Sequence, residues 1–157
     1  KHEEYGLDFY LEAIRYCAQL GAKGPRMEPW VTNGEIIAGL EPPEDSIRAI
    51  DWIAGVNAIP TVCVFRPLQG TEYKHLEPPK TEDVLPVFQR LYAACMEKAL
   101  PVGVAPNVHV SLVMLPDECR WLQDEPNKYW AAELKLKVMR KFFRWERLNP
   151  EMSTVTV

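Results

Sequence analysis

Apolar and polar positions alternate along the chain with two periods, which predict helices and strands in turn. Apolar residues spaced three or four apart predict helices over about 7–20, 44–56, 81–99 and 127–146. Runs rich in β-branched residues predict strands over 31–39, 59–67 and 108–115. Because a helix separates each pair of strands, the strands should run parallel with right-handed crossovers. The pattern therefore predicts an α/β domain built as a parallel barrel or sheet.

The helical stripes also predict which residues are buried. In the first helix, the expected buried face consists of Leu7, Tyr10, Leu11, Ile14, Cys17 and Ala18. In the third, it consists of Val84, Val87, Phe88, Leu91, Ala94 and Cys95. The last helix has many Lys and Arg residues between its apolar positions, which are Trp130, Leu134, Met139 and Phe142 or Phe143.

Length and charge narrow the classes of function. The chain has 157 residues, which suggests one domain, and a formal net charge of −4. It has no Lys/Arg-rich run, so we expect no nucleic-acid partner. It has no apolar run near the ~20 residues of a membrane helix and no signal-peptide pattern, so we expect no membrane partner and a cytoplasmic location. Since the first residue is Lys1, we expect a processed chain or a part of a longer one.

The four cysteines do not form a recognisable ligand motif. Cys17, Cys63, Cys95 and Cys119 are far apart in the sequence and no CxxC occurs. Cys17 and Cys95 lie on apolar helical stripes and Cys63 lies inside a strand, so we expect free buried thiols, as in a reducing cytoplasm. The sequence also contains no HExxH and no locally supported Ser-His-Asp arrangement. It therefore assigns no catalytic residue and no metal ligand.

Polar residues in and after the strands are the candidate ligands. Glu35 lies in mid-strand, and Arg66, at the end of the next strand, is its natural ion-pair partner. We favour this structural pairing for Glu35 over contact with a substrate. Arg66 could equally pair at the rim or grip a carboxylate or phosphate. Asn33 shares a face with Glu35 and could bind a hydroxyl group. His109 is expected to be a hydrogen-bonded core residue, with a substrate contact as the alternative.

Two segments at the strand ends resemble a known enzyme family. Gly39-Leu-Glu-Pro-Pro-Glu-Asp-Ser-Ile47 resembles the segment that begins the helix after the fifth strand of radical S-adenosylmethionine (SAM) enzymes. Phe65-Arg-Pro-Leu-Gln-Gly-Thr71 resembles the end of their sixth strand, with its Gly-Thr. The branch that resembles this chain most is that of biotin synthase and the thiamine tyrosine lyase-like enzymes. The resemblance covers about residues 5–115.

The resemblance implies a partial TIM-like (βα) barrel, the carboxyl-terminal half, over about 5–115. A helical extension over about 116–148 and a flexible tail over 149–157 would complete the single domain. In this family a [4Fe-4S] cluster on a CxxxCxxC motif cleaves SAM, and the 5′-deoxyadenosyl radical abstracts hydrogen from a small-molecule substrate. These residues contain no CxxxCxxC. The resemblance therefore implies that the cluster ligands belong to the remaining barrel half of the same protein.

The same resemblance implies roles for individual residues. Aligned on Gly39, the family pattern G-x-I-x-G-x-x-E places Ile37 on the family isoleucine and leaves Glu41 one position before the acid. The implied cofactor-binding residues are Ile37, Gly39, Glu41 and Arg66. The implied substrate-binding residues are Asn33, Glu35 and His109.

Two other functions are compatible with the same pattern. The chain could be a non-catalytic α/β domain that binds a ligand or a partner, without redox chemistry. It could also be part of a barrel hydrolase or lyase, which predicts a metal site or an acid–base pair at the strand ends.

Overall fold

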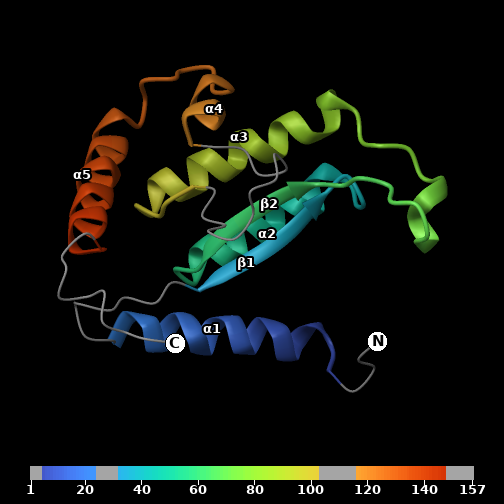
Figure 1. The fold of residues 1–157 in the computed structure, drawn as a ribbon, viewed down its shortest axis with the longest axis horizontal. Helices are drawn as coiled ribbons and strands as arrows, with labels where there is room; N and C mark the ends of the chain where they lie inside the picture. The colour runs from blue at the N-terminus through green and yellow to red at the C-terminus, as the bar shows by residue number, and fades with distance from the viewer. Residues whose placement is uncertain (1–4, 24–31, 103–115, 148–157) are drawn as a thin grey trace.

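The structure is a computed structural model of the chain, and it describes residues 5–23, 32–102 and 116–147 (Figure 1). In order, the elements are α1 (Leu7–Lys23), β1 (Asn33–Ala38), α2 (Pro43–Gly55), β2 (Ile59–Val64), the 3-10 helix η1 (Glu72–His75), α3 (Thr81–Glu97), α4 (Pro116–Trp121) and α5 (Trp130–Arg147). The strands β1 and β2 are parallel neighbours. The α/β class and the parallel direction of the first two strands are confirmed. The predicted third strand, 108–115, and the tail, 149–157, lie outside the described residues.

The predicted boundaries of the other long elements are close to the observed ones, but two short helices were missed. The 3-10 helix η1 lies within the predicted loop after β2, and α4 begins at Pro116, where a strand was expected to end. Each is only four to six residues long, which is too short for a helical period of apolar residues to be recognised.

The unit β1–α2–β2 is the centre of the fold. Its two strands pair in register from Asn33 with Ile59 to Ala38 with Val64. The helix between them begins at Pro43, where a proline is tolerated, and has Glu44 and Asp45 in its first turn, where they suit the helix dipole. It ends in a Schellman-type turn with Asn57 at a φ of 61°, and the Ala58 amide donates to the Ile53 carbonyl. This turn reverses the chain directly into β2.

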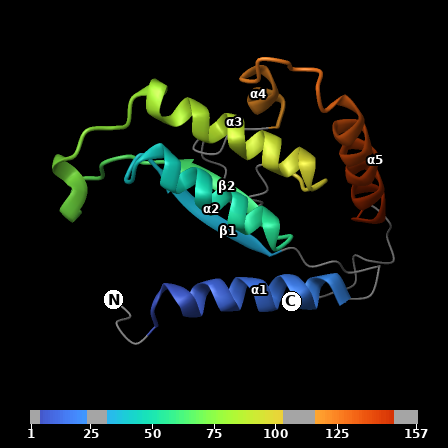
Figure 2. The ribbon, with the colours of Figure 1, turned by 180° about the vertical axis from the view of Figure 1, so that it is seen from behind.

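One face of the sheet, here called the covered face, packs against α2 and α3. Gly34 lies on it, because a Cβ added there would be 2.7 Å from the side chain of Ile53 in α2. By alternation and register, Ile36, Ala38 and Val62 share this face. The buried core beyond it combines residues of α2 and α3 with the sheet and includes Ile50, Val87, Phe88, Leu91, Tyr92 and Cys95. The two views in Figures 1 and 2 show α2 against one face of the sheet, roughly along the strands, with α3 on the β2 side.

A buried polar network attaches α4 and α5 to α3. The Tyr92 hydroxyl donates to Glu133 Oε1, and Arg120 lies 3.2 Å from Glu133 Oε2. Arg120 also donates to the Pro126 carbonyl at 3.0 Å. Gln89 donates to the Leu122 carbonyl at 2.6 Å. Each buried polar group in this network therefore has a partner, which is what allows a carboxylate to be buried between helices.

The predicted buried face of α1 is wrong for three of its six members. Ala18 is buried, whereas Leu7, Tyr10 and Cys17 are exposed. The helix lies beside the β1 side of the sheet (Figures 1 and 2), and Arg15 stacks over the Trp52 ring of α2. An amphipathic stripe predicts a buried face only if a neighbouring element covers it, and in the described residues little covers α1.

Candidate functional site

The carboxyl ends of β1 and β2 lie at the same end of the sheet, as the parallel arrangement requires. Ala38 pairs with Val64, so the segment Gly39–Glu41 and the segment that contains Arg66 leave the sheet side by side. The side chains of Glu41 and Arg66 are exposed. Neither makes an ion pair with another described residue. This end therefore presents one carboxylate and one guanidinium to solvent, next to each other in the topology.

Gly39 has two reasons to be glycine. Its φ is 99°, a conformation that L residues rarely adopt. A Cβ added there would also collide with the ring of Pro79. Pro79 belongs to the segment between η1 and α3, so the long loop after β2 folds back onto the tip of β1. The loop thus lies at the same end as Glu41, as the parallel strands predict, and Pro79 occupies the approach to the Gly39 backbone.

The sheet face that points away from α2, here called the polar face, has a short ladder of polar side chains. It consists of Asn33, Glu35 and Ile37 from β1 and Ile59, Thr61 and Cys63 from β2. The buried Thr61 hydroxyl donates to the Asn33 side-chain oxygen. The Cys63 thiol donates to Glu35 Oε1 at 3.5 Å. Ile37, half-exposed, lies at the end of the ladder nearest the strand tips.

The Cys63 thiol is held in its protonated form. Burial raises its pKa above the ordinary value, and the hydrogen bond to Glu35 and the negative charge of that carboxylate raise it further. A thiolate next to a carboxylate would be repelled by it, so Cys63 is neither an activated nucleophile nor a ready metal ligand at neutral pH. Its role on the polar face is that of a hydrogen-bond donor.

The predicted pairing of Glu35 with Arg66 is wrong. Glu35 lies opposite Thr61 in the register, and Arg66 is five residues further along. At about 3.3 Å per residue that is roughly 16 Å along the strand, beyond the reach of an ion pair. Glu35 takes its hydrogen bond from Cys63 instead. The two strands had been placed correctly as neighbours, but their register cannot be read from composition.

One predicted site residue, His109, and three residues that contact predicted site residues remain to be placed. His109 lies outside the described residues. Thr61, Cys63 and Pro79 contact predicted site residues but were not predicted to do so. The alternation in β2 places Thr61 and Cys63 on one face, and this signal was present in the sequence. The contact of Pro79 with Gly39 had no local signal because it depends on the path of the loop.

The residues do not fit an iron–sulfur cluster. In the described parts of the chain, no group of three or more His, Cys, Asp or Glu side chains is placed to hold a metal ion. Cys95 and Cys119 are buried, and burial raises the pKa of each thiol to about 12. Both stay protonated at neutral pH, whereas cluster ligands are thiolates.

The residues at the strand tips do match the chemistry of S-adenosylmethionine. That molecule has a carboxylate, an ammonium group and a flat base. An exposed guanidinium suits the first and an exposed carboxylate suits the second. Ile37 offers an apolar surface beside them, with half of its side chain accessible. Arg66 and Glu41 make no ion pair with another described residue, so neither charge is neutralised by a neighbour in that part of the chain.

Comparisons with known proteins identify no relative. No protein-family model matches the chain, and neither the curated proteins nor the solved structures give a match.

Proposed function

We propose that this chain provides part of the S-adenosylmethionine- and substrate-binding surface of a radical SAM enzyme, as part of a (βα) barrel. The observation that carries the proposal is the parallel pairing of β1 and β2, which brings the Gly39–Glu41 turn and Arg66 to one end of the sheet. These are the two segments whose sequences resemble that family. Their juxtaposition is what a shared cofactor site requires.

Each residue then has a stated task. Arg66 would bind the carboxylate of S-adenosylmethionine and Glu41 its ammonium group. Ile37 would lie against the adenine, close to Gly39 and Pro79. Glu35, on the polar face, would orient the substrate, together with His109. Asn33, predicted to do the same, lies at the amino end of β1 opposite Ile59, roughly 20 Å from the strand tips at about 3.3 Å per residue, and receives no role in the proposed site. When bound, the cofactor would supply the group that abstracts hydrogen from the substrate, and the protein's part is to bind and align it.

The cluster is proposed to be held by residues other than these 157. The chain has four cysteines, none in a CxxxCxxC motif, and the buried pair is protonated. The proposal therefore includes a remaining barrel half with the cysteine motif. No step of the reaction is assigned to a cysteine of this chain.

The test is to prepare the complete protein that carries this chain under anaerobic conditions. We expect iron–sulfur absorbance, and 5′-deoxyadenosine when the protein is reduced in the presence of S-adenosylmethionine. Arg66→Ala should weaken binding of S-adenosylmethionine by about tenfold or more, since a hydrogen-bonded charge pair is lost. Arg48→Ala is the matched control, because Arg48 is also exposed but pairs with Asp45 on α2. Absence of both the cluster and the nucleoside product would contradict the proposal.

A second candidate is a binding domain without redox chemistry. It is favoured by one observation: the polar groups of Asn33 and Glu35 are already hydrogen-bonded to Thr61 and Cys63, as in a purely structural sheet. In that case S-adenosylmethionine or another ligand would bind at the strand tips, and Arg66→Ala would still weaken it. No 5′-deoxyadenosine would form, which separates the two candidates.

A further inference from the structure

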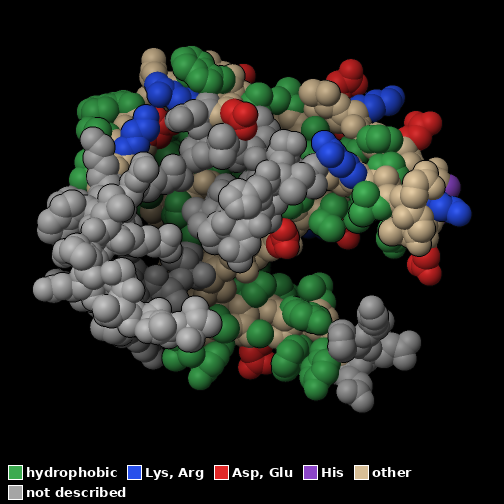
Figure 3. Space-filling view, viewed as in Figure 1, with side chains coloured by type: hydrophobic (Ala, Val, Ile, Leu, Met, Phe, Trp, Pro, Cys, Tyr) green, Lys and Arg blue, Asp and Glu red, His purple; other side chains and the backbone are tan. Residues whose placement is uncertain are grey.

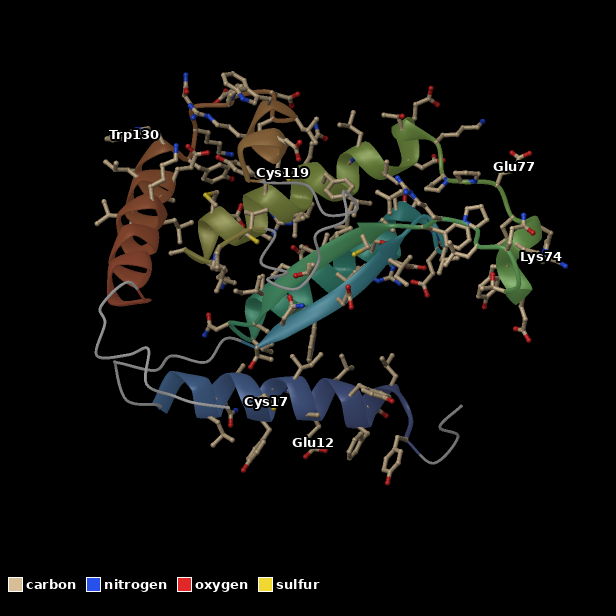
Figure 4. All side chains as sticks on the ribbon, viewed as in Figure 1. Glu12, Cys17, Lys74, Glu77, Cys119 and Trp130 are labelled. Atoms are coloured by element: carbon tan, nitrogen blue, oxygen red, sulfur yellow. The ribbon has the colours of Figure 1, made fainter. Side chains whose placement is uncertain are left out.

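The outward face of α5 has an apolar stripe that the fold does not use. Trp130, Leu134 and Val138 follow each other at intervals of four residues, and their side chains are 62%, 54% and 47% exposed. The opposite side of the helix faces the core through Leu136 and Glu133, which are buried. Trp130 begins the helix at the periphery of the molecule (Figure 4). The exposed stripe is thus separate from the residues that attach α5 to α3.

Lysines flank this stripe on both sides. A helix turns by about 100° per residue, so Lys137 lies next to Trp130 on one side, and Lys135 lies beyond Val138 on the other. Both lysines are exposed, and neither makes an ion pair within the described parts of the chain. An apolar centre between two cationic borders is the pattern of a helix that lies in the surface of a membrane.

Charge is distributed unevenly between α5 and the rest of the protein. The α5 sequence has six Lys or Arg residues and two Glu, a formal net charge of +4, whereas the whole chain carries −4. An anionic surface would therefore repel most of the molecule and attract this helix. Charge complementarity both selects the partner and sets the orientation of the protein on it.

We propose that α5 docks on an anionic phospholipid surface, with Trp130, Leu134 and Val138 entering the headgroup region and Lys135 and Lys137 contacting lipid phosphates. A tryptophan at the end of the stripe suits this depth, since its ring is apolar and its N–H can reach water. No described helix is both long and apolar enough to cross a bilayer, and surface docking needs none. The inference is independent of the function proposed for the strand tips, and it replaces the expectation from the sequence that the chain has no membrane partner.

The test is sedimentation of the 157-residue chain with vesicles. We expect the chain to sediment with vesicles of phosphatidylcholine and phosphatidylserine at low salt, and to stay in the supernatant at high salt. With vesicles of pure phosphatidylcholine it should stay in the supernatant at either salt concentration. Lys135→Glu with Lys137→Glu should weaken binding by about 30-fold or more, at about 1 kcal/mol per lysine lost. Leu134→Glu should weaken it by at least about tenfold, because a charge replaces an inserted side chain.

Leu68→Glu is the matched control. Leu68 is also an exposed leucine, but it lies in the loop after β2 and not on a helix face flanked by lysines. Its vesicle binding should equal that of the unchanged protein. Far-ultraviolet circular dichroism checks that each variant is folded. The proposal is overturned if the unchanged chain does not sediment with the anionic vesicles, or if Leu134→Glu leaves binding unchanged. It is also overturned if Leu134→Glu instead abolishes a concentration-dependent dimer in light scattering, which would assign the stripe to a second copy of the chain.

Discussion

The two faces of the β1–β2 sheet are held by different interactions. On the covered face, Ala38 and Val62 contact a core of large apolar side chains from α2 and α3, and the backbone comes close enough that Gly34 has no room for a Cβ. On the polar face, side chains pair across the strands by hydrogen bonds, Thr61 with Asn33 and Cys63 with Glu35. Figure 3 shows acidic, basic and apolar side chains mixed on the surface where the described residues are visible.

The two faces are therefore expected to contribute differently to the stability of the fold and to ligand binding. Apolar burial contributes most of the folding free energy, whereas the exposed hydrogen bond of Cys63 with Glu35 contributes little because water can replace it. The covered face therefore should tolerate few substitutions. The exposed part of the polar face, around Glu35 and Ile37, and the strand tips can change their ligand chemistry at small cost to the fold, which is why we place the proposed site there. Ile59 and Thr61 of the same face are buried and are expected to tolerate fewer changes.

The largest expected effect is a loss of stability from the covered side. Leu91→Ala removes a fully buried side chain of α3 and should lower the free energy of unfolding by about 2–5 kcal/mol. Ile37→Ala, on the half-exposed end of the polar face, should lower it by less than about 1 kcal/mol. Urea unfolding of both variants measures the difference, and equal losses would show that the polar face is also part of the core.

Gly39→Ala should destabilise the protein by about 2–4 kcal/mol, because the new methyl group meets Pro79 in addition to the cost of a positive φ. Gly70→Ala is the matched control. Gly70 has a φ of 87° but nothing within 4 Å of an added Cβ, so only the backbone cost of about 1 kcal/mol should appear. Thermal unfolding gives both values. A loss no greater at Gly39 than at Gly70 would mean that the loop does not rest on the strand tip.

Alkaline pH should lower the stability of the fold through the buried thiols and the buried tyrosine beside α3. In the folded protein the pKa of Cys95 and that of Cys119 are raised from 9.0 to about 12, and burial also raises the pKa of Tyr92 above its ordinary value. The unfolded chain therefore loses these protons first. Stability is complete below about pH 9 and falls as the pH rises, by up to about 1.4 kcal/mol per pH unit for each group.

Urea unfolding at several pH values between 8 and 11 measures this decline. Tyr92→Phe provides the control, because it removes one titrating group. Whatever its absolute stability, this variant should show a shallower decline above pH 10 than the unchanged protein. An unchanged slope would mean that the Tyr92 hydroxyl does not remain protonated in the fold.

The smallest expected effect concerns reactivity rather than stability. Glu35→Gln removes a negative charge beside Cys63, so the pKa of that thiol should fall and its alkylation at pH 8 should become faster by a few-fold. Stability should change by less than about 0.5 kcal/mol. Mass spectrometry of the Cys63 peptide gives the rate. Glu41→Gln, which alters a carboxylate at the strand tip, should leave the rate as it was.

The strongest local patterns predicted the elements well. The α2 and α3 stripes and the β-branched run of β2 gave elements close to the observed ones, and Val87, Leu91 and Cys95 are buried as expected. In these segments periodicity and burial agree because each apolar stripe meets another element. In α1 the same kind of stripe left Leu7 and Tyr10 exposed, since what covers a helix is decided by the rest of the fold.

The candidate site was predicted in part. The alternation of side chains placed Asn33, Glu35 and Ile37 on one face, and the parallel direction brought the strand ends together, both of which the structure shows. The partner of Glu35 was wrong because it depends on register, and a shift of a few residues changes every cross-strand pair. The cofactor roles of Ile37, Gly39, Glu41 and Arg66 stay predictions.

By itself, the sequence determined the alternation of helices and strands and which residues share each face of β1. These properties follow from the intrinsic period of each element and from backbone sterics, which are local. Only the tertiary structure decided that Cys63 pairs with Glu35, that Pro79 rests on Gly39, and that Trp130 faces outward. Those contacts join residues far apart in the chain, so their geometry is set by how the elements pack together rather than by any segment alone.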